Sequence, residues 1–225
     1  AAGATITFHD LLDGEGDGIE DLTLTAGRGN VNFDAEVGGN QRIGDLTITT
    51  AANVTFLAPV TAVSIDQQAG TGTTTVQTTN DPNDATELGI DLNTVDVVLN
   101  GAVNTTGNGQ VEITNTGLLD IADAANMTLN GAFLQNGGGT VQTAGSIETT
   151  GDTIDFTDSV ALTDGAAADV LLDTTGGGAA GATITFHDLL DGEGDGIEDL
   201  TLTAGRGNVN FDAEVGGNQR IGDLT

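Results

Sequence analysis

The chain has 225 residues, of which 34 are Asp or Glu and only four are Lys or Arg, so its formal net charge at pH 7 is -30. It contains no Cys, and therefore forms neither disulfides nor thiolate metal sites. The acidity opposes binding to nucleic acid phosphates, which depends on clustered Lys and Arg. No apolar segment approaches the ~20 residues of a membrane helix. We therefore expect no nucleic acid partner and no membrane insertion of this segment.

Short runs of alternating apolar and polar residues predict β-strands with one buried face. Val, Ile and Thr are frequent in these runs, and Gly, Asn and Asp separate them. In chain order, the expected strands lie within 6–12, 22–26, 31–37, 46–50, 54–60, 73–79, 97–103, 111–114, 118–122, 127–133, 154–160 and 169–173. Helical periodicity is nearly absent, so the fold class is all-β.

One long duplication sets the domain organisation. The segment 1–47 recurs without change as 179–225, so that Ala1 corresponds to Ala179 and Thr47 to Thr225. Residues 1–178 therefore read as one full period, and residues 179–225 as the start of the next. We expect the chain to be a piece of a longer tandem array.

A shorter degenerate motif recurs inside the period. It has an apolar-x-apolar triplet, three small or polar residues and a further apolar residue, as in VNFDAEV at 31–37 and VTFLAPV at 54–60. Repeats of roughly 20–30 residues favour a right-handed parallel β-helix, or β-solenoid, in which each coil completes its core only by stacking on its neighbours. At ~20 residues and ~4.8 Å per coil, one period should hold about nine coils and be roughly 40–45 Å long. The alternative is a row of tandem β-sandwich domains.

Two stretches carry a family resemblance, namely TLTAGRGNVNFDAEVGGNQRIGDLTITTAANVTFLAPVTA and MTLNGAFLQNGGGTVQTAGSIETTGDTIDFTDSVALTDG. Both resemble the repeats of giant secreted bacterial surface proteins of the filamentous-haemagglutinin-like type. The resemblance implies a secreted, surface-attached β-helix fibre that serves in adhesion or as an extracellular filament. Because the end coils of such a fibre expose unpaired β-edges, we expect self-association end to end, with lateral bundling as an option. The sequence does not identify a cell-surface or matrix receptor.

The densest acidic segment, LLDGEGDGIEDL at 11–22, has the spacing of a short calcium loop. Carboxylates at positions 1, 3, 5 and 9, Gly at 6 and a backbone carbonyl at 7 would come from Asp13, Glu15, Asp17, Asp21, Gly18 and Ile19. The closing Glu of an EF-hand is missing, because Leu24 stands at position 12. The copy of the loop places the same ligands at Asp191, Glu193, Asp195, Ile197 and Asp199. The alternative is a solvated acidic loop without a cation.

Other candidate sites have weaker patterns. A second acidic insertion at 80–87 contains Asp81, Asp84 and Glu87. His9 and its copy His187 are expected to face solvent beside the next Asp in the chain, because one His per period cannot build a zinc site. The four Arg residues are expected to pair with acids on neighbouring coils or on neighbouring rods. The Ser residues have no His nearby and no nucleophile elbow, so we expect no enzyme.

The expected function is structural. We expect the chain to form part of a long extracellular rod on a bacterial surface, used for attachment, cell–cell contact or matrix. A calcium- or carbohydrate-binding module of a secreted protein is the alternative. An ice-binding solenoid, suggested by TGTTTVQTT at 71–79, and a polysaccharide-cleaving β-helix are remote alternatives.

Overall fold

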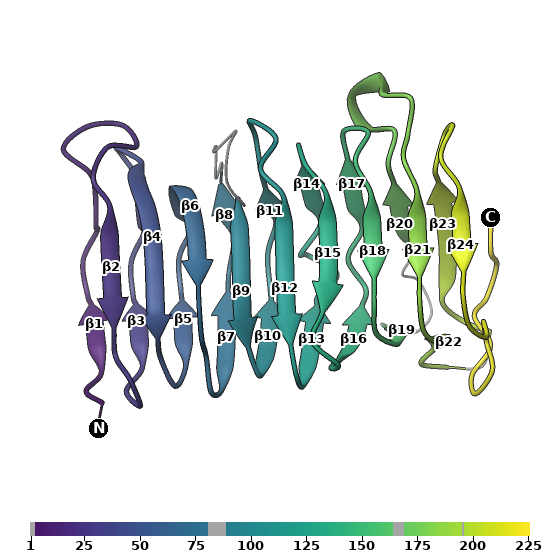
Figure 1. Ribbon diagram of the computed structural model, residues 1–225, viewed down its shortest axis with the longest axis horizontal. Helices are drawn as coiled ribbons and strands as arrows, with labels where there is room; N and C mark the ends of the chain where they lie inside the picture. Colours follow the sequence, from purple (N-terminus) through teal and green to yellow (C-terminus); the bar gives the residue numbers. More distant parts are fainter. Residues whose placement is uncertain (1–2, 81–88, 164–168, 195) are drawn as a thin grey trace.

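In the computed structural model, the chain winds as a single column of stacked coils with its termini at opposite ends (Figure 1). The structure describes residues 3–80, 89–163, 169–194 and 196–225. As the chain advances from left to right in Figure 1, the nearer strands run down and the farther strands run up, so the winding is right-handed. The expected parallel β-solenoid is confirmed.

Three parallel sheets form the faces of the column, and each coil contributes in the order sheet A, sheet B, sheet C. Sheet A contains β1 (Ile6–Phe8), β3 (Val31–Phe33), β5 (Val54–Phe56), β7 (Thr73–Val76), β10 (Asp96–Leu99), β13 (Leu118–Ile121), β16 (Thr140–Thr143), β19 (Val160–Leu162) and β22 (Leu190–Gly192). These nine strands are eight steps apart from end to end, so the column has about eight turns.

The other two sheets meet at one long strand, β6 (Val60–Gln67), which pairs with β8 in sheet B and with β9 in sheet C. Sheet B continues through β8 (Thr79–Asn80), β11 (Val103–Asn104), β14 (Met127–Leu129), β17 (Ile147–Thr149), β20 (Asp169–Asp173) and β23 (Asp199–Thr203). Sheet C contains β2 (Leu22–Thr25), β4 (Ile43–Thr50), β6, β9 (Ile90–Thr94), β12 (Val111–Asn115), β15 (Phe133–Asn136), β18 (Ile154–Phe156), β21 (Ile184–Phe186) and β24 (Val209–Phe211).

The strand ladders are parallel throughout these sheets, with partners one coil apart. The coils differ in length: in sheet A, Val160 pairs with Val141 of a short coil on one side and with Leu190 of a longer coil on the other. Sandwich domains are built from antiparallel sheets, so the tandem β-sandwich alternative is wrong. A single 3-10 turn, η1 (Gly176–Gly178), is the helical element among the described residues, and no helix there is long and apolar enough to cross a membrane.

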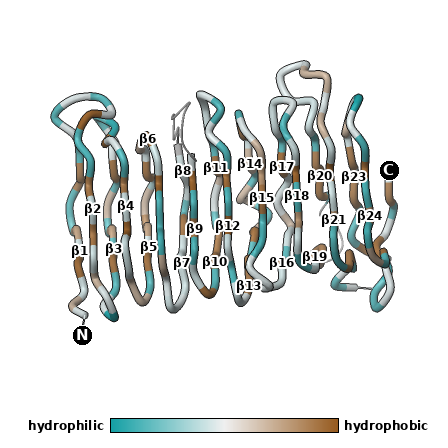
Figure 2. The backbone as a smooth tube through the Cα atoms, viewed as in Figure 1, coloured by the Kyte–Doolittle hydropathy of each residue, from teal (hydrophilic) through white to brown (hydrophobic). Residues whose placement is uncertain are grey.

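Alternation along each strand builds the core. Apolar residues recur at every second position of the strands, while the loops at the column edges are mostly polar (Figure 2). The Phe residues gather in two rows. Phe8, Phe33 and Phe56 stack in sheet A with centroids 5.1 and 4.8 Å apart. In sheet C, Phe156, Phe186 and Phe211 stack, and Phe133 lies tilted by 52° against Phe156.

The degenerate motif turns out to encode a corner between two sheets. In VNFDAEV, Val31 and Phe33 lie in sheet A, and Val37 bridges to Val60 in sheet B. The same motif spans the corner from B to C at 127–133 and the corner from C to A at 154–160. Local sequence therefore specifies a corner, but not which of the three corners it becomes.

The period does not hold a whole number of coils. Ile6 lies in sheet A, but its copy Ile184 lies in sheet C, one sheet position before β22. One period therefore spans eight turns less one third, that is 7⅔ turns, or about 37 Å. This is fewer than the nine coils expected, because loops such as that between β1 and β2 lengthen the coils beyond ~20 residues.

Candidate functional site

The acidic loop between β1 and β2 arches above the N-terminal coils, where it is drawn in purple in Figure 1. Gly18 has a φ of 72°, which allows the sharp turn at the position that the sequence predicts. Ile19, whose carbonyl was the predicted position-7 ligand, exposes 71% of its surface. The loop therefore has the expected turn at its tip.

The predicted calcium carboxylates mainly accept hydrogen bonds from the next coil. Asp13 accepts from the backbone N–H and the side-chain amide of Asn40, at 3.0 and 2.8 Å. Asp21 accepts from the backbone N–H of Asp45 at 2.9 Å. The bonds from Asn40 lower the pKa of Asp13. These carboxylates tie the loop to the coil below.

Glu20 and Asp17 close the remainder of the loop. Glu20 Oε2 accepts the backbone N–H groups of Glu15 and Gly16, at 3.0 and 3.1 Å. Asp17 Oδ1 lies 3.5 Å from Arg42 Nε, on the next coil. This ion pair agrees with the expected pairing of Arg with acids of neighbouring coils, and it joins a mostly buried Arg42 side chain to an exposed Asp17.

The copy of the loop keeps the bonds that Asp13 and Asp21 accept from the next coil, in a more buried setting. Asn218 donates to both oxygens of Asp191, at 3.2 and 2.8 Å, and the N–H of Asp223 bonds Asp199 at 2.6 Å. The preceding coil now packs against the loop, and the Glu193 N–H donates to the carbonyl of Leu162 on that coil at 2.8 Å. Glu198 is 1% exposed there, whereas its copy Glu20 is exposed.

Calcium binding at this loop stays a prediction. Within the described ranges, no group of three or more His, Asp or Glu residues is arranged to hold a metal ion. Asp195 lies outside the described residues, as do Asp81, Asp84 and Glu87 of the second acidic insertion. The predicted ligands Glu15, Ile19 and Ile197 lie at the exposed surface of their loops.

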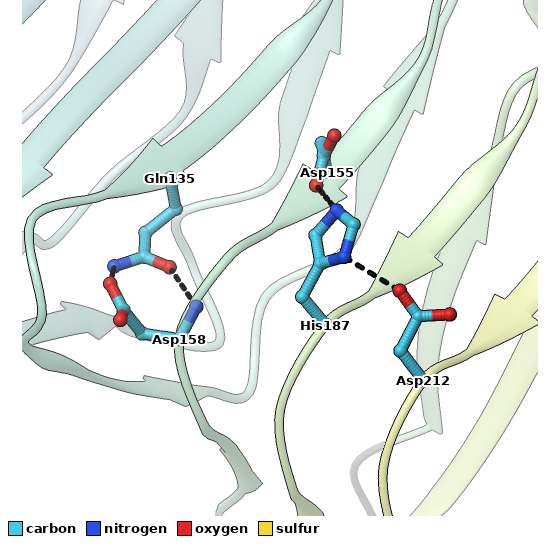
Figure 3. A network of polar contacts seen from close by, with 5 residues as sticks. All are labelled: Gln135, Asp155, Asp158, His187 and Asp212. Carbon is cyan, nitrogen blue, oxygen red and sulfur yellow. Dashed lines mark hydrogen bonds and ion pairs between the residues drawn. The ribbon is translucent and has the colours of Figure 1, made fainter.

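The histidines pair with acids on neighbouring coils. The expected neighbour was the next Asp in the chain. His9 Nδ1 lies 2.6 Å from Asp34 Oδ2, one coil away. His187 lies between two acids, with Nδ1 2.7 Å from Asp212 Oδ2 and Nε2 3.2 Å from Asp155 Oδ1 (Figure 3). The sequence contained a signal for the first pair, because His9 and Asp34 hold the same position in ITFHDLL and VNFDAEV.

A buried polar network near the corner from sheet C to sheet A was not predicted. Gln135 Nε2 donates to Asp158 Oδ2 at 3.0 Å, and Gln135 Oε1 accepts the N–H of Asp158 (Figure 3). Gln135 Nε2 also donates to Asn115 Oδ1 at 2.8 Å. Gln135 and Asn115 are fully buried. The network joins three successive coils, and such satisfied buried groups fix the register of a fold.

Three carboxylates lie in register on the outer face of sheet C. Asp66 pairs with Asp91, and Asp91 pairs with Glu112, on adjacent strands. Burial, together with the charges of Glu112 and Asp66, raises the pKa of Asp91 to about 6. This row is a second acidic feature, which only the coil register reveals.

The outward Thr residues do not form one uninterrupted ladder. On sheet A, the column that contains Thr55 and Thr75 also contains Asn32 above them and Val98 below them. This arrangement gives no support to the ice-binding alternative, which needs Thr in register over many successive coils.

The hydroxyls of two Ser residues form hydrogen bonds between coils. Ser64 donates to Asp45 at 2.7 Å, and Ser146 accepts the N–H of Leu171 at 3.0 Å. Both bonds join neighbouring coils, as the bonds of the acidic loop do.

Comparison with known proteins gives no relative. No protein-family model, no curated protein and no solved structure matches the chain. The parallel β-helix that the family resemblance implies is present, while a filamentous-haemagglutinin-like origin stays a prediction.

Proposed function

We propose that the chain is part of the shaft of a long extracellular rod, a surface filament or giant adhesin of a bacterium, and that its role is structural. Attachment, cell–cell contact and matrix formation are the uses that such a rod serves. The proposal is supported by the fold, by the duplication and by the surface charge, each of which suits an extended fibre.

The observation that carries the proposal is the unbroken ladder across the start of the second copy. In sheet C, β18 pairs with β21, the first strand of that copy. In sheet A, β19 pairs with β22, and in sheet B, β20 pairs with β23. A new period therefore begins with no interruption of backbone hydrogen bonding, as a shaft of many periods requires.

The acidic surface supports the same role. With 34 acidic residues and four cations, rods of this sequence repel one another in water. That repulsion keeps a long, regular structure soluble at low ionic strength. Salt or divalent cations would weaken it and permit lateral contact.

The function is tested on the producing cell. We expect antibodies raised against this chain to label thin rods outside the cell, and deletion of the coding gene to remove both the rods and attachment to the natural surface. A strain with the gene restored is the control. Labelling confined to the cell interior would contradict the proposal.

Calcium binding is the second function, and the spacing of the loop carboxylates favours it. Calorimetry of the chain with CaCl2 should give heat that is lost in the double variant Glu15→Gln/Glu193→Gln. The variant Asp120→Asn, in sheet A and away from both loops, is the control. No heat, together with a melting temperature that EGTA leaves unchanged, would remove calcium from the account.

A further inference from the structure

The two identical segments fold in the same way on different faces of the column. Ile6 pairs with Val31 in sheet A, and the copies Ile184 and Val209 pair in the same register in sheet C. The N–H of Gly18 bonds the carbonyl of the next coil at 2.7 Å, and the same bond of its copy Gly196 is also 2.7 Å long. Neighbouring coils, and not the choice of sheet, therefore determine the local structure.

The edge of the second segment that faces the C-terminal end of the column is apolar and solvent-exposed. Val209 and Leu224 are 37% and 46% exposed, whereas their copies Val31 and Leu46 are 0% exposed. The sequence of the two edges is identical, so the difference in exposure comes only from the coil that stacks on the C-terminal side of Val31 and Leu46.

The first segment shows what fits this edge. Val31 and Phe33 are covered by Val54 and Phe56 of β5. Farther along the same coil, the bridge partner of Val37 is Val60, and the partner of Leu46 is Ile65. The covering coil consists of residues 48–67, which directly follow the duplicated segment.

We propose that the open edge is covered by a coil with the sequence of residues 48–67, as the continuation of the second copy of the period, and that each further period is turned by one third of a turn about the rod. The inference rests on the proposed function, because it requires periods in tandem. It assigns the covering residues: the copies of Val54, Val60 and Ile65 lie on Val209, Val215 and Leu224.

The rotation follows from the 7⅔ turns of the period. The acidic loop lies at the corner from sheet B to sheet C in the first copy, between Leu12 and β2. In the second copy it lies at the corner from sheet A to sheet B, between β22 and β23. A third copy places it at the remaining corner, so three periods return the loop to its first face. The rod therefore presents the same acidic surface, to cations or to a basic partner, in all three lateral directions.

A second path of the chain, in which one period spans a whole number of turns, would need a coil of ordinary length. It can therefore be tested against the one-third rotation. If the period spanned whole turns, Thr185 would lie in sheet A beside Ala161, and the coil between them would be about as long as that between Thr7 and Asn32. In the structure, Thr185 lies beside Asp155 in sheet C. The two arrangements give Thr185 different neighbours on the outer surface.

Pyrene labelling of cysteine pairs distinguishes them, and the chain has no Cys of its own. In the full chain, Asp155→Cys/Thr185→Cys should give strong excimer emission, because neighbouring parallel strands are ~4.8 Å apart. The matched pair Ala161→Cys/Thr185→Cys should give none. Excimer in the second pair alone, or in neither pair, overturns the one-third rotation.

Cryo-electron microscopy of the native rod tests the extension to many periods. We expect a rise of about 37 Å and a rotation near one third of a turn per period, with an axial repeat of about 110 Å. Rods that repeat after a single period with no rotation overturn the inference and leave the proposed function standing. If the producing cell makes no rods, the proposed function fails, while the pyrene pairs still decide the rotation within the chain.

Discussion

At the scale of the residue, the duplication provides pairs of identical side chains in different settings. Phe33 stacks between Phe8 and Phe56, while its copy Phe211 has only Phe186 on one side. Each lost contact removes buried aromatic area from this narrow, mainly aliphatic core. The pair therefore separates the effect of coil stacking from the effect of local sequence.

We expect Phe33→Ala to lower the free energy of unfolding by about 3–5 kcal/mol, as for a fully buried aromatic residue. Phe211→Ala should lower it by about half as much or less, because the side chain is only half-buried. Urea denaturation followed by circular dichroism measures both. Equal losses of unfolding free energy in the two variants would show that the edge at the C-terminal end of the column is covered in solution.

A second residue-scale prediction concerns Asp91, whose pKa is raised to about 6 by burial and by Glu112 and Asp66. A carboxyl with a raised pKa in the folded state favours folding when protonated, and this contribution is lost as the pH rises from about 4 to 6. Asp91→Asn should therefore stabilise the chain at pH 7 and have little effect at pH 3. Since much of the group stays in solvent, we expect about 1 kcal/mol, or a melting temperature about 2–4 °C higher.

The control for Asp91 removes one negative charge elsewhere. Asp120 lies in register between Val98 and Gln142 on sheet A, with no acid directly above or below it. Asp120→Asn should leave the melting temperature at pH 7 almost unchanged. A similar gain in both variants would assign the effect to net charge and not to the acidic row.

At the scale of the element, the corners decide how strands become a column. Gly38 has a φ of 71° and directly follows Val37, the last residue of its corner motif. A Cβ at Gly38 would collide with the carbonyl oxygen of Thr61, on the coil below. The copy Gly216 has a φ of 67°, but its nearest neighbour to such a Cβ is 3.3 Å away.

We therefore expect Gly216→Ala to cost about 1–2 kcal/mol, the penalty of the left-handed backbone alone. Gly38→Ala should cost more, because the carbonyl of Thr61 must move and the 2.8 Å bond from the Thr61 N–H to the Val37 carbonyl is disturbed. Thermal melting of the two variants compares these costs. Hydrogen exchange at Thr61 should speed up only in Gly38→Ala, and equal costs in the two variants would contradict the role of the coil below.

The strands and the solenoid could be predicted from the sequence, but the sheet to which each strand belongs could not. Alternation placed strands such as Val54–Phe56 and Ile154–Phe156, because a buried face requires it. It could not assign them to sheets A and C, because one motif serves every corner. The partner of Asp13 was missed because it lies one coil away, at a distance that loop lengths set. The partner of His9 also lies one coil away, and only the equal motif positions of His9 and Asp34 indicate it.

At the scale of the whole molecule, two assemblies give the same rod. A single giant chain could carry many periods, or separate subunits could stack end to end. The unbroken ladder from β18 to β21 favours the single chain, because the connection between periods is covalent here. We expect denatured rods to give a mass of many periods, and a band near one period would contradict the giant chain. Fibre diffraction should show a ~4.8 Å spacing along the rod axis in both cases.

The interchangeable corners also bear on how such a gene can change. Unequal recombination between the identical stretches 1–47 and 179–225 adds or removes one whole period at a time. Because any sheet can follow the shared corner motif, each product keeps a continuous ladder even though its later coils are reassigned to other faces. In the proposed filament, variation in copy number among strains would thus alter the length of the rod without disturbing its folding.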